Sequence, residues 1–328
     1  MKEDKFNTND PTLSVDLSEA TQAVKENRFE DGLALFKIIL NDHPDNIDAL
    51  YLASVSSRYL KEFDDSKKYI ERLLLNAPDM GRAYQELGHI NRDMGNEEKA
   101  AINYRQACEL NPALLASWNL LYKYFVKNKN QPAADHARQQ IEKLQSLPPA
   151  LLYIDQILNE GRLGLAERQC RAFLKKNPTH TYAMSLLSEI ANRLGYFDDA
   201  EFLLEKAVEF KPNDGDLRMQ YAAILRKKQK FAKTMEQVNI LCDQYPDNPI
   251  YQAQKASEMM QNGDHQRAIK MFDDILSKNP YNFSTHTSKG HAQKTLGKTD
   301  QAIKSYQNAY KIKPDHGEAF FSLANLKT

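Results

Sequence analysis

The chain has 328 residues, with 44 basic and 44 acidic side chains and a pI near 7.1. This balance argues against nucleic acid or an anionic membrane as a partner of the whole molecule, because both attract a clear excess of positive charge. No stretch approaches the roughly 18 apolar residues that a membrane-spanning helix needs. The first ten residues are polar and lack the apolar run of a secretory signal. We therefore expect a cytoplasmic protein.

From residue 13 onward the sequence repeats with a period of 34, and a proline marks the same point of most units. These prolines are Pro44, Pro78, Pro112, Pro178, Pro212, Pro246, Pro280 and Pro314. Proline cannot continue a helix, so a proline that closes units of this length indicates a solenoid of helix-turn-helix repeats. Residues 1–12 precede the first unit, and we expect them to form a disordered lead.

We number each unit so that its proline is position 32; the units then start at residues 13, 47, 81, 115, 147, 181, 215, 249 and 283. Positions 4, 7, 8 and 11 share one face of a first helix, and positions 20, 24 and 27 share one face of a second. Small residues at positions 8 and 20, such as Gly88 and Ala100, should let the two helices approach closely. Glycine at position 15, as at Gly95 and Gly297, predicts a left-handed residue between the helices.

The unit that starts at residue 81 carries the full set of marked positions. They are Tyr84, Leu87, Gly88, Gly95, Ala100, Tyr104, Ala107 and Pro112. This pattern resembles the tetratricopeptide repeat (TPR), and the likeness extends over residues 13–316. The resemblance implies an all-α solenoid, a right-handed superhelix of about nine helix-turn-helix repeats plus one unpaired terminal helix. It also implies a scaffold that binds proteins or peptides.

The repeat is interrupted between Pro112 and Pro178, which lie 66 residues apart instead of two full periods. The missing pair of residues falls near Pro148 and Pro149, and a double proline favours an extended link. We expect a subdomain boundary at 146–149, while a degenerate but continuous stack is the alternative. The predicted parts are residues 1–12, 13–146, 147–316 and 317–328.

A tenth unit begins at Gly317 and reaches only its first helix. Phe320 and Phe321 help to make this segment apolar nearly all round, whereas a capping helix should present a polar outer face. We expect the natural protein to continue past Thr328, with a self-contained cap as the alternative. Self-association through the apolar ends is a further option.

Residues 317–328 also resemble the junction found in bacterial proteins that join a TPR array to a sulfotransferase domain. This resemblance implies a following domain that binds 3'-phosphoadenosine 5'-phosphosulfate, with the array positioning an acceptor such as a protein tyrosine. It covers only twelve residues, and no catalytic residue can be transferred from it. We keep it as the alternative to a scaffold.

The chain itself shows no pattern for catalysis, a cofactor or a metal. Cys108, Cys170 and Cys242 lie far apart without a Cys-x-x-Cys pair, which favours buried thiols in a reducing compartment. The histidines lack zinc-motif spacing, and the glycines lack the clustering of a phosphate-binding loop. We therefore expect this chain not to be an enzyme.

The remaining candidate site is a groove. By resemblance to TPR arrays, positions 2, 5, 9, 12 and 13 of the first helices should line a concave face. The candidates combine cations with side chains that can stack or hydrogen-bond. They are Arg58, Tyr59, Gln85, His89, Arg92, Asn119, Lys123, Tyr182, Arg193, Met219, Arg226 and Lys294. We predict that this groove binds an acidic peptide segment; a solvated charged face is the alternative.

Overall fold

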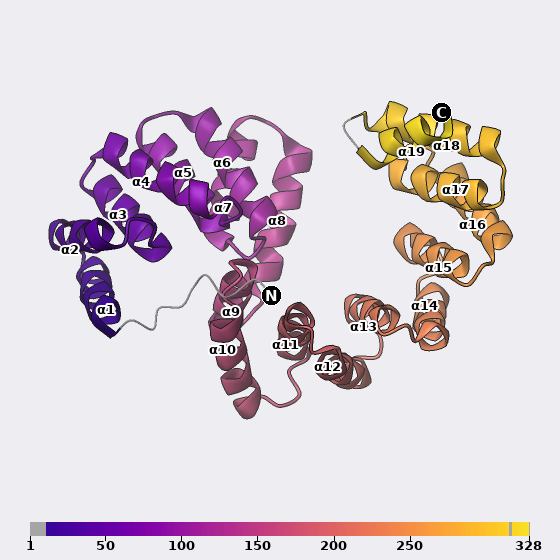
Figure 1. The fold of residues 1–328 in the computed structure, drawn as a ribbon, viewed down its shortest axis with the longest axis horizontal. Coiled ribbons are helices and arrows are strands. Elements are labelled where there is room, and N and C mark those ends of the chain that lie inside the picture. Colours follow the sequence, from indigo (N-terminus) through magenta and orange to yellow (C-terminus); the bar gives the residue numbers. More distant parts are fainter. Residues whose placement is uncertain (1–10, 315–316, 328) are drawn as a thin grey trace. The chain divides into compact units, whose positions relative to one another are not determined.

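The computed structural model describes residues 11–314 and 317–327, and within this part of the chain every regular element is an α-helix (Figure 1). The chain divides into two compact units, Met1–Phe173 and Leu174–Thr328. The first unit holds α1 (Pro11–Lys25), α2 (Phe29–Asp42), α3 (Ile47–Tyr59), α4 (Phe63–Asn76), α5 (Gly81–Asp93), α6 (Glu97–Leu110), α7 (Leu115–Lys127), α8 (Gln131–Gln145), α9 (Pro149–Asn159) and most of α10 (Leu163–Lys176). The second holds α11 (Thr181–Leu194), α12 (Phe197–Phe210), α13 (Gly215–Lys227), α14 (Phe231–Gln244), α15 (Pro249–Gln261), α16 (His265–Lys278), α17 (Phe283–Thr295), α18 (Thr299–Ile312) and α19 (Gly317–Lys327).

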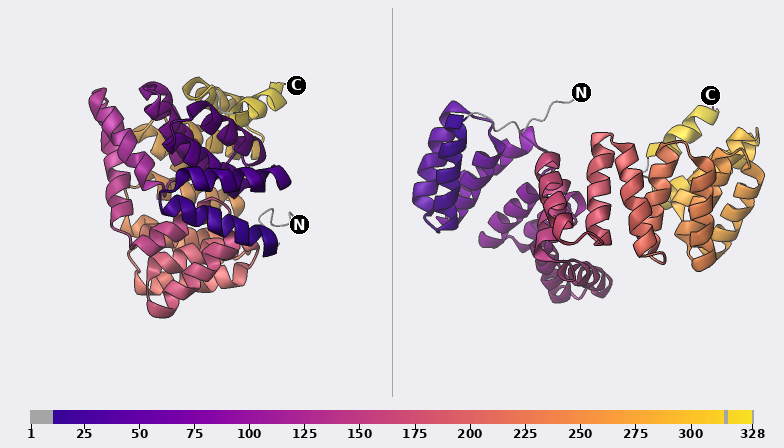
Figure 2. Two further views of the ribbon diagram at one scale, coloured as in Figure 1. Left: turned by 90° about the vertical axis from the view of Figure 1, so that its left-hand side faces the viewer. Right: turned by 90° about the horizontal axis from the view of Figure 1, so that it is seen from below.

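The helices follow the predicted repeat, so the predicted all-α array of helix-turn-helix units is confirmed. In the third repeat, α5 covers positions 1–13 and α6 covers positions 17–30. The two helices of a repeat pack against each other, as in the pairs α3–α4, α5–α6, α11–α12 and α17–α18 (Figure 2). Each pair buries its apolar face between its own helices and those of the next repeat.

The small residues of the pattern lie where two helices touch. A Cβ atom added to Gly88 on α5 would lie 2.5 Å from Cε1 of Tyr104 on α6. The same pairing recurs in the ninth repeat, where a Cβ on Gly290 would lie 2.6 Å from Cε1 of Tyr306. The predicted close approach is therefore confirmed at position 8 of these repeats. The small residues at position 20, Ala100 and Ala302, are buried.

The residue at position 15 is left-handed in all nine repeats, whereas the sequence predicted this conformation only where the residue is glycine. Five repeats have glycine there, at Gly95, Gly161, Gly195, Gly263 and Gly297, with φ between 72° and 84°. The other four have Asn27, Lys61, Lys129 and Gln229, with φ between 56° and 64°. A left-handed conformation is unfavourable for a residue with a Cβ, so the packing of the two helices imposes this turn whatever residue occupies it.

We expect Lys61→Gly to stabilise the protein by about 1 kcal/mol, because it removes the strain of a Cβ at φ 64°. The matched control is the reverse change, Gly95→Lys, which should destabilise by about the same amount. A Cβ on Gly95 would meet no atom within 4 Å, so its effect comes from the backbone alone. Urea unfolding followed by circular dichroism measures both changes. A lower unfolding midpoint for Lys61→Gly would contradict the prediction.

The interruption of the repeat corresponds to a shortened helix. Helix α9 has 11 residues, compared with 13 in α7, and it begins at Pro149. Pro148 precedes it with ψ at 138°, in an extended conformation. The predicted boundary at 146–149 lies inside the first unit, since the division between the two units falls within α10.

The helical array begins slightly earlier in the chain than expected. Helix α1 begins at Pro11, so residues 11 and 12 belong to a helix and not to the predicted lead; residues 1–10 lie outside the described residues. Helix α19 packs on α18.

The cysteines Cys108, Cys170 and Cys242 are free and buried, as predicted. None of the helices described has both the length and the apolar character that crossing a membrane requires.

Candidate functional site

The predicted groove residues are divided between the two compact units. Arg58, Tyr59, Gln85, His89, Arg92, Asn119 and Lys123 belong to the first unit. Tyr182, Arg193, Met219, Arg226 and Lys294 belong to the second.

Arg58 is enclosed by carboxylates of the next repeat. Its Nε lies 2.6 Å from Oε1 of Glu86, and its Nη1 lies 3.1 Å from Oδ2 of Asp93. The side chain of Arg58 is 10% exposed and that of Glu86 is 3% exposed. The charge of Arg58 is thus balanced inside the protein by contacts that join two repeats.

Other cations among the predicted groove residues are also paired. Arg226 lies 2.9 Å from the buried Glu258 of the following repeat, and Arg193 lies 2.8 Å from Glu189 on its own helix. Arg92 contacts the neighbouring Asp93 at 2.8 Å but remains 43% exposed. Four of the predicted groove cations, Arg58, Arg92, Arg193 and Arg226, therefore form ion pairs.

The uncharged candidates are mostly half-buried. Tyr59 is 55% exposed and stacks on Phe29, with 4.3 Å between ring centroids. The amide of Asn119 donates to the carbonyl oxygen of Leu115 at 2.8 Å, within its own helix. Gln85, Tyr182 and Met219 are half-buried, whereas Lys123 and Lys294 are exposed. Of the first-unit candidates, Arg92 and Lys123 line the same pocket.

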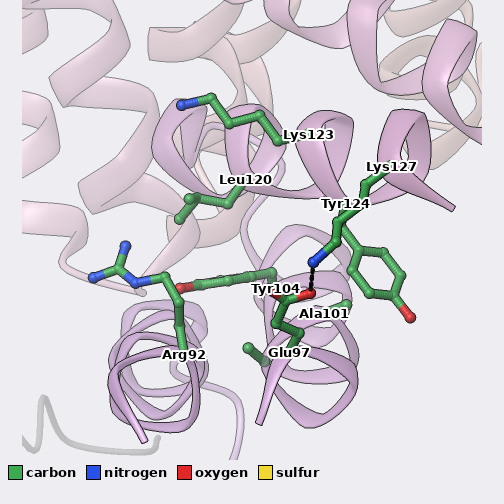
Figure 3. A pocket seen from close by; sticks show the side chains of 9 residues that line it. Arg92, Glu97, Ala101, Tyr104, Leu120, Lys123, Tyr124 and Lys127 are labelled. Atoms are coloured by element: carbon green, nitrogen blue, oxygen red, sulfur yellow. Dashed lines mark hydrogen bonds and ion pairs between the residues drawn. The ribbon is translucent and has the colours of Figure 1, made fainter. Parts of the chain in front are cut away.

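Arg92 and Lys123 border a pocket between α5, α6 and α7, with a cavity volume of about 170 Å³ (Figure 3). The pocket is lined by Arg92, Glu97, Ala100, Ala101, Tyr104, Leu120, Lys123, Tyr124 and Lys127. Three of these residues are cations and one is an acid. The remaining ones are aromatic or aliphatic, so the pocket has an apolar interior and a basic rim.

The two sides of this pocket differ. On one side, Lys127 of α7 and Glu97 of α6 form an ion pair of 2.5 Å, which connects two repeats (Figure 3). On the other side, Arg92 and Lys123 extend from α5 and α7, and the hydroxyl of Tyr104 points toward Arg92 (Figure 3). This second side presents two exposed cations beside an apolar surface. It is the side that suits a carboxylate attached to an apolar group.

Small residues on α6 leave the room for this cavity. Ala101 is at position 21, where other repeats carry larger side chains. These are Leu33, Glu201, Ile269 and Ile303. The expected groove positions did not include Tyr104, Leu120 or Tyr124, because Tyr104 is on a second helix and the other two occupy positions 6 and 10. The alanine at position 21 is the sequence signal that could have located the pocket.

His89, one of the predicted groove residues, is engaged with the same tyrosine. Its Nδ1 lies 2.9 Å from the hydroxyl of Tyr104, and the two rings meet edge to face. The ninth repeat contains the same pair, with 2.9 Å between Nδ1 of His291 and the hydroxyl of Tyr306. Burial, with the nearby cations Arg58 and Arg92, lowers the pKa of His89 to about 4. His89 is therefore neutral at pH 7 and acts as a structural partner of Tyr104.

We expect stability to fall as the pH decreases from about 6.5 toward about 4, because an unfolded histidine with a pKa near 6.5 takes up a proton before the folded one does. The contribution of His89 should be up to about 3 kcal/mol. His89→Gln should remove this contribution and flatten the pH dependence of the unfolding free energy. Proton NMR measures the residue directly, and a His89 signal that titrates near pH 6.5 would disprove the assignment.

Comparison with known proteins identifies the repeat. The family model described as tetratricopeptide repeat matches residues 81–114, 182–214 and 283–316. Among solved structures, MamA is 17% identical, with a TM-score of 0.44, over 50% of this chain and 96% of its own. YrrB, described as a TPR protein with an unusual peptide-binding site, is 16% identical, with a TM-score of 0.44, over 56% of this chain and 96% of its own. A thermophilic TPR protein of Thermus thermophilus is 16% identical, with a TM-score of 0.44, over 54% of this chain and 97% of its own. The chain thus contains tetratricopeptide repeats within an all-α array of helix-turn-helix units.

Proposed function

We propose that this protein is an interaction scaffold whose first unit binds an acidic segment of a partner protein in the pocket between α5, α6 and α7. The observation that carries the proposal is the rim of Arg92, Lys123 and Lys127 around an apolar interior, with Glu97 as the one acid among the lining residues. The tetratricopeptide repeat supports a binding role in general, and the charge of this rim supports an acidic ligand.

The chemistry of the rim favours recognition of a carboxylate next to an apolar side chain. Lys123 is exposed and has no ion-pair partner among the residues that the structure describes, so a ligand carboxylate can approach it without displacing another acid. The surfaces of Tyr104 and Leu120 can cover an apolar side chain of the ligand. Because helices hold these groups in place, little entropy is lost on binding, and the positive rim speeds the encounter.

The test is Lys123→Glu, measured by fluorescence anisotropy with labelled acidic peptides that carry one leucine. We expect at least about tenfold weaker binding, because the change replaces an attraction by a repulsion. The matched control is Lys143→Glu, which makes the same charge change at an exposed position of α8 outside the pocket. Affinity of the unmodified protein should fall as salt rises. Equal affinities for the two variants, or affinity that is insensitive to salt, would refute the proposal.

The resemblance of residues 317–328 to a sulfotransferase junction stays a prediction, together with its sulfate donor. Residues 317–327 form α19, which packs on α18 as the first helix of a further repeat is expected to pack. The repeat pattern accounts for this arrangement by itself. The geometry of α19 therefore does not favour the sulfotransferase alternative over a scaffold.

A further inference from the structure

The end of α9 makes contacts that skip its neighbouring repeat. Oε2 of Glu160 accepts a hydrogen bond of 2.7 Å from Nη2 of Arg82 at the start of α5. Arg162 lies 3.6 Å from Asp48 at the start of α3. Pairs such as Lys127 with Glu97 join adjacent repeats, whereas these two join the fifth repeat to the third and second. The turn after α9 therefore contacts the starts of α3 and α5, the first helices of the second and third repeats.

The carboxylate of Glu160 occupies an environment that is typical of a ligand site. Its side chain is 3% exposed, although it carries a charge. The guanidinium of Arg82 holds it and also lies over the ring of Tyr51, 5.1 Å from the ring centroid. An aromatic face and a forked cation together form a specific carboxylate site. Arg82 is at position 2, one of the positions expected to line the concave face. The repeat spacing does not predict that its partner is Glu160.

A second set of contacts holds α9 in this place without charges. The side-chain amide of Gln156 donates to the carbonyl oxygen of Ala113 at 2.9 Å, and the amide of Asn111 donates to the carbonyl oxygen of Gln156 at 3.0 Å. These bonds join α9 to the link between α6 and α7. Helix α9, which begins after Pro148 and is shorter than α7, is thus also the helix whose end contacts repeats that are not adjacent to its own.

We propose that the turn Glu160–Arg162 is an internal ligand, and that an acidic segment of a partner displaces Glu160 from the carboxylate site formed by Arg82 and Tyr51. This inference rests on the proposed function, since both require an acidic partner. Arg82 and Arg92 stand ten residues apart on α5, or about 15 Å along the helix axis. An extended peptide covers this distance with about five residues, so the preferred segment has acidic residues at two points separated by that spacing.

Displacement makes the apparent affinity depend on how often the turn is open. The apparent dissociation constant equals the intrinsic one divided by the open fraction, so weakening the internal contact should tighten binding of the external segment. Glu160→Gln weakens it by removing the charge that Arg82 attracts. The matched control is Glu167→Gln, the same substitution on α10, where Glu167 pairs with the exposed Arg171.

The experiment measures binding of fluorescein-labelled hexaglutamate and hydrogen exchange of residues 149–162 in full-length protein. We expect Glu160→Gln to bind several-fold more tightly than the unmodified protein and Glu167→Gln to bind equally. Hexaglutamate should also accelerate exchange of residues 149–162 in the unmodified protein. Equal binding by Glu160→Gln and the unmodified protein, including binding by neither, would overturn the inference.

Two further variants keep the result interpretable. If Glu160→Gln fails to fold, Arg162→Gln loosens the same turn while leaving Arg82 in place, and it should give the same gain in affinity. Lys123→Glu separates the two proposals. Tighter binding by Glu160→Gln without any effect of Lys123→Glu would reject the pocket and support the internal ligand. Weaker binding by Lys123→Glu without any gain from Glu160→Gln would do the reverse.

Discussion

Gly88→Ala should destabilise the protein by about 2 to 3 kcal/mol, although alanine favours a helix over glycine by about 1 kcal/mol. The added Cβ would lie 2.5 Å from Cε1 of Tyr104, which is closer than two carbon atoms can approach without a shift. Tyr104 is 3% exposed, and its hydroxyl is 2.9 Å from Nδ1 of His89. The ring therefore cannot move aside without breaking other contacts of the third repeat.

Urea unfolding provides the measurement, and Gly164→Ala provides the matched control. Gly164 is also in a helix, as the second residue of α10, but a Cβ there would meet no atom within 4 Å. Alanine should therefore raise stability slightly, by less than about 1 kcal/mol. Gly88→Ala combined with Tyr104→Leu should be more stable than the sum of the two single changes predicts. Equal effects of alanine at Gly88 and Gly164 would show that the close packing at position 8 does not matter.

The repeat could be predicted because local rules determine it. The proline period, the small residue at Gly88 and the glycine at Gly95 each act through nearby atoms, so their effect recurs in the repeats that carry these residues. The left-handed turns at Lys61 and Lys129 show the limit of this approach. Tertiary packing imposes them against the preference of the residue, so the residue type alone gives no signal.

The candidate site was harder to predict because its properties depend on partners that are distant in sequence. Position 12 placed Arg58 on the expected helix face, but Glu86 in the next repeat balances its charge. Position 2 likewise contains Arg82, whose partner Glu160 is 78 residues away. A sequence pattern gives the face on which a side chain lies, whereas the carboxylate that reaches that side chain depends on the stacking of several repeats.

Arg58→Met should lower the unfolding free energy by about 3 to 5 kcal/mol, because it leaves Glu86 buried without its cation. Burial then favours the protonated form of Glu86, so the loss should be larger at pH 7 than at pH 4. Combining Arg58→Met with Glu86→Leu removes both charges and should recover most of the loss. Chemical denaturation at the two pH values measures all three proteins.

Arg171→Met is the matched control, because Arg171 pairs with Glu167 at 2.8 Å on the surface of α10, with its side chain 60% exposed. That change should reduce stability by less than about 1 kcal/mol at either pH, since water and salt screen an exposed pair. The comparison also bears on binding. If Arg58→Met reduces stability no more than Arg171→Met does, Glu86 does not depend on Arg58, and the guanidinium is available to an acidic ligand as its position in the repeat predicted. A large, pH-dependent loss instead assigns Arg58 to the contact between repeats and leaves Arg92 and Lys123 as the cations that face a partner.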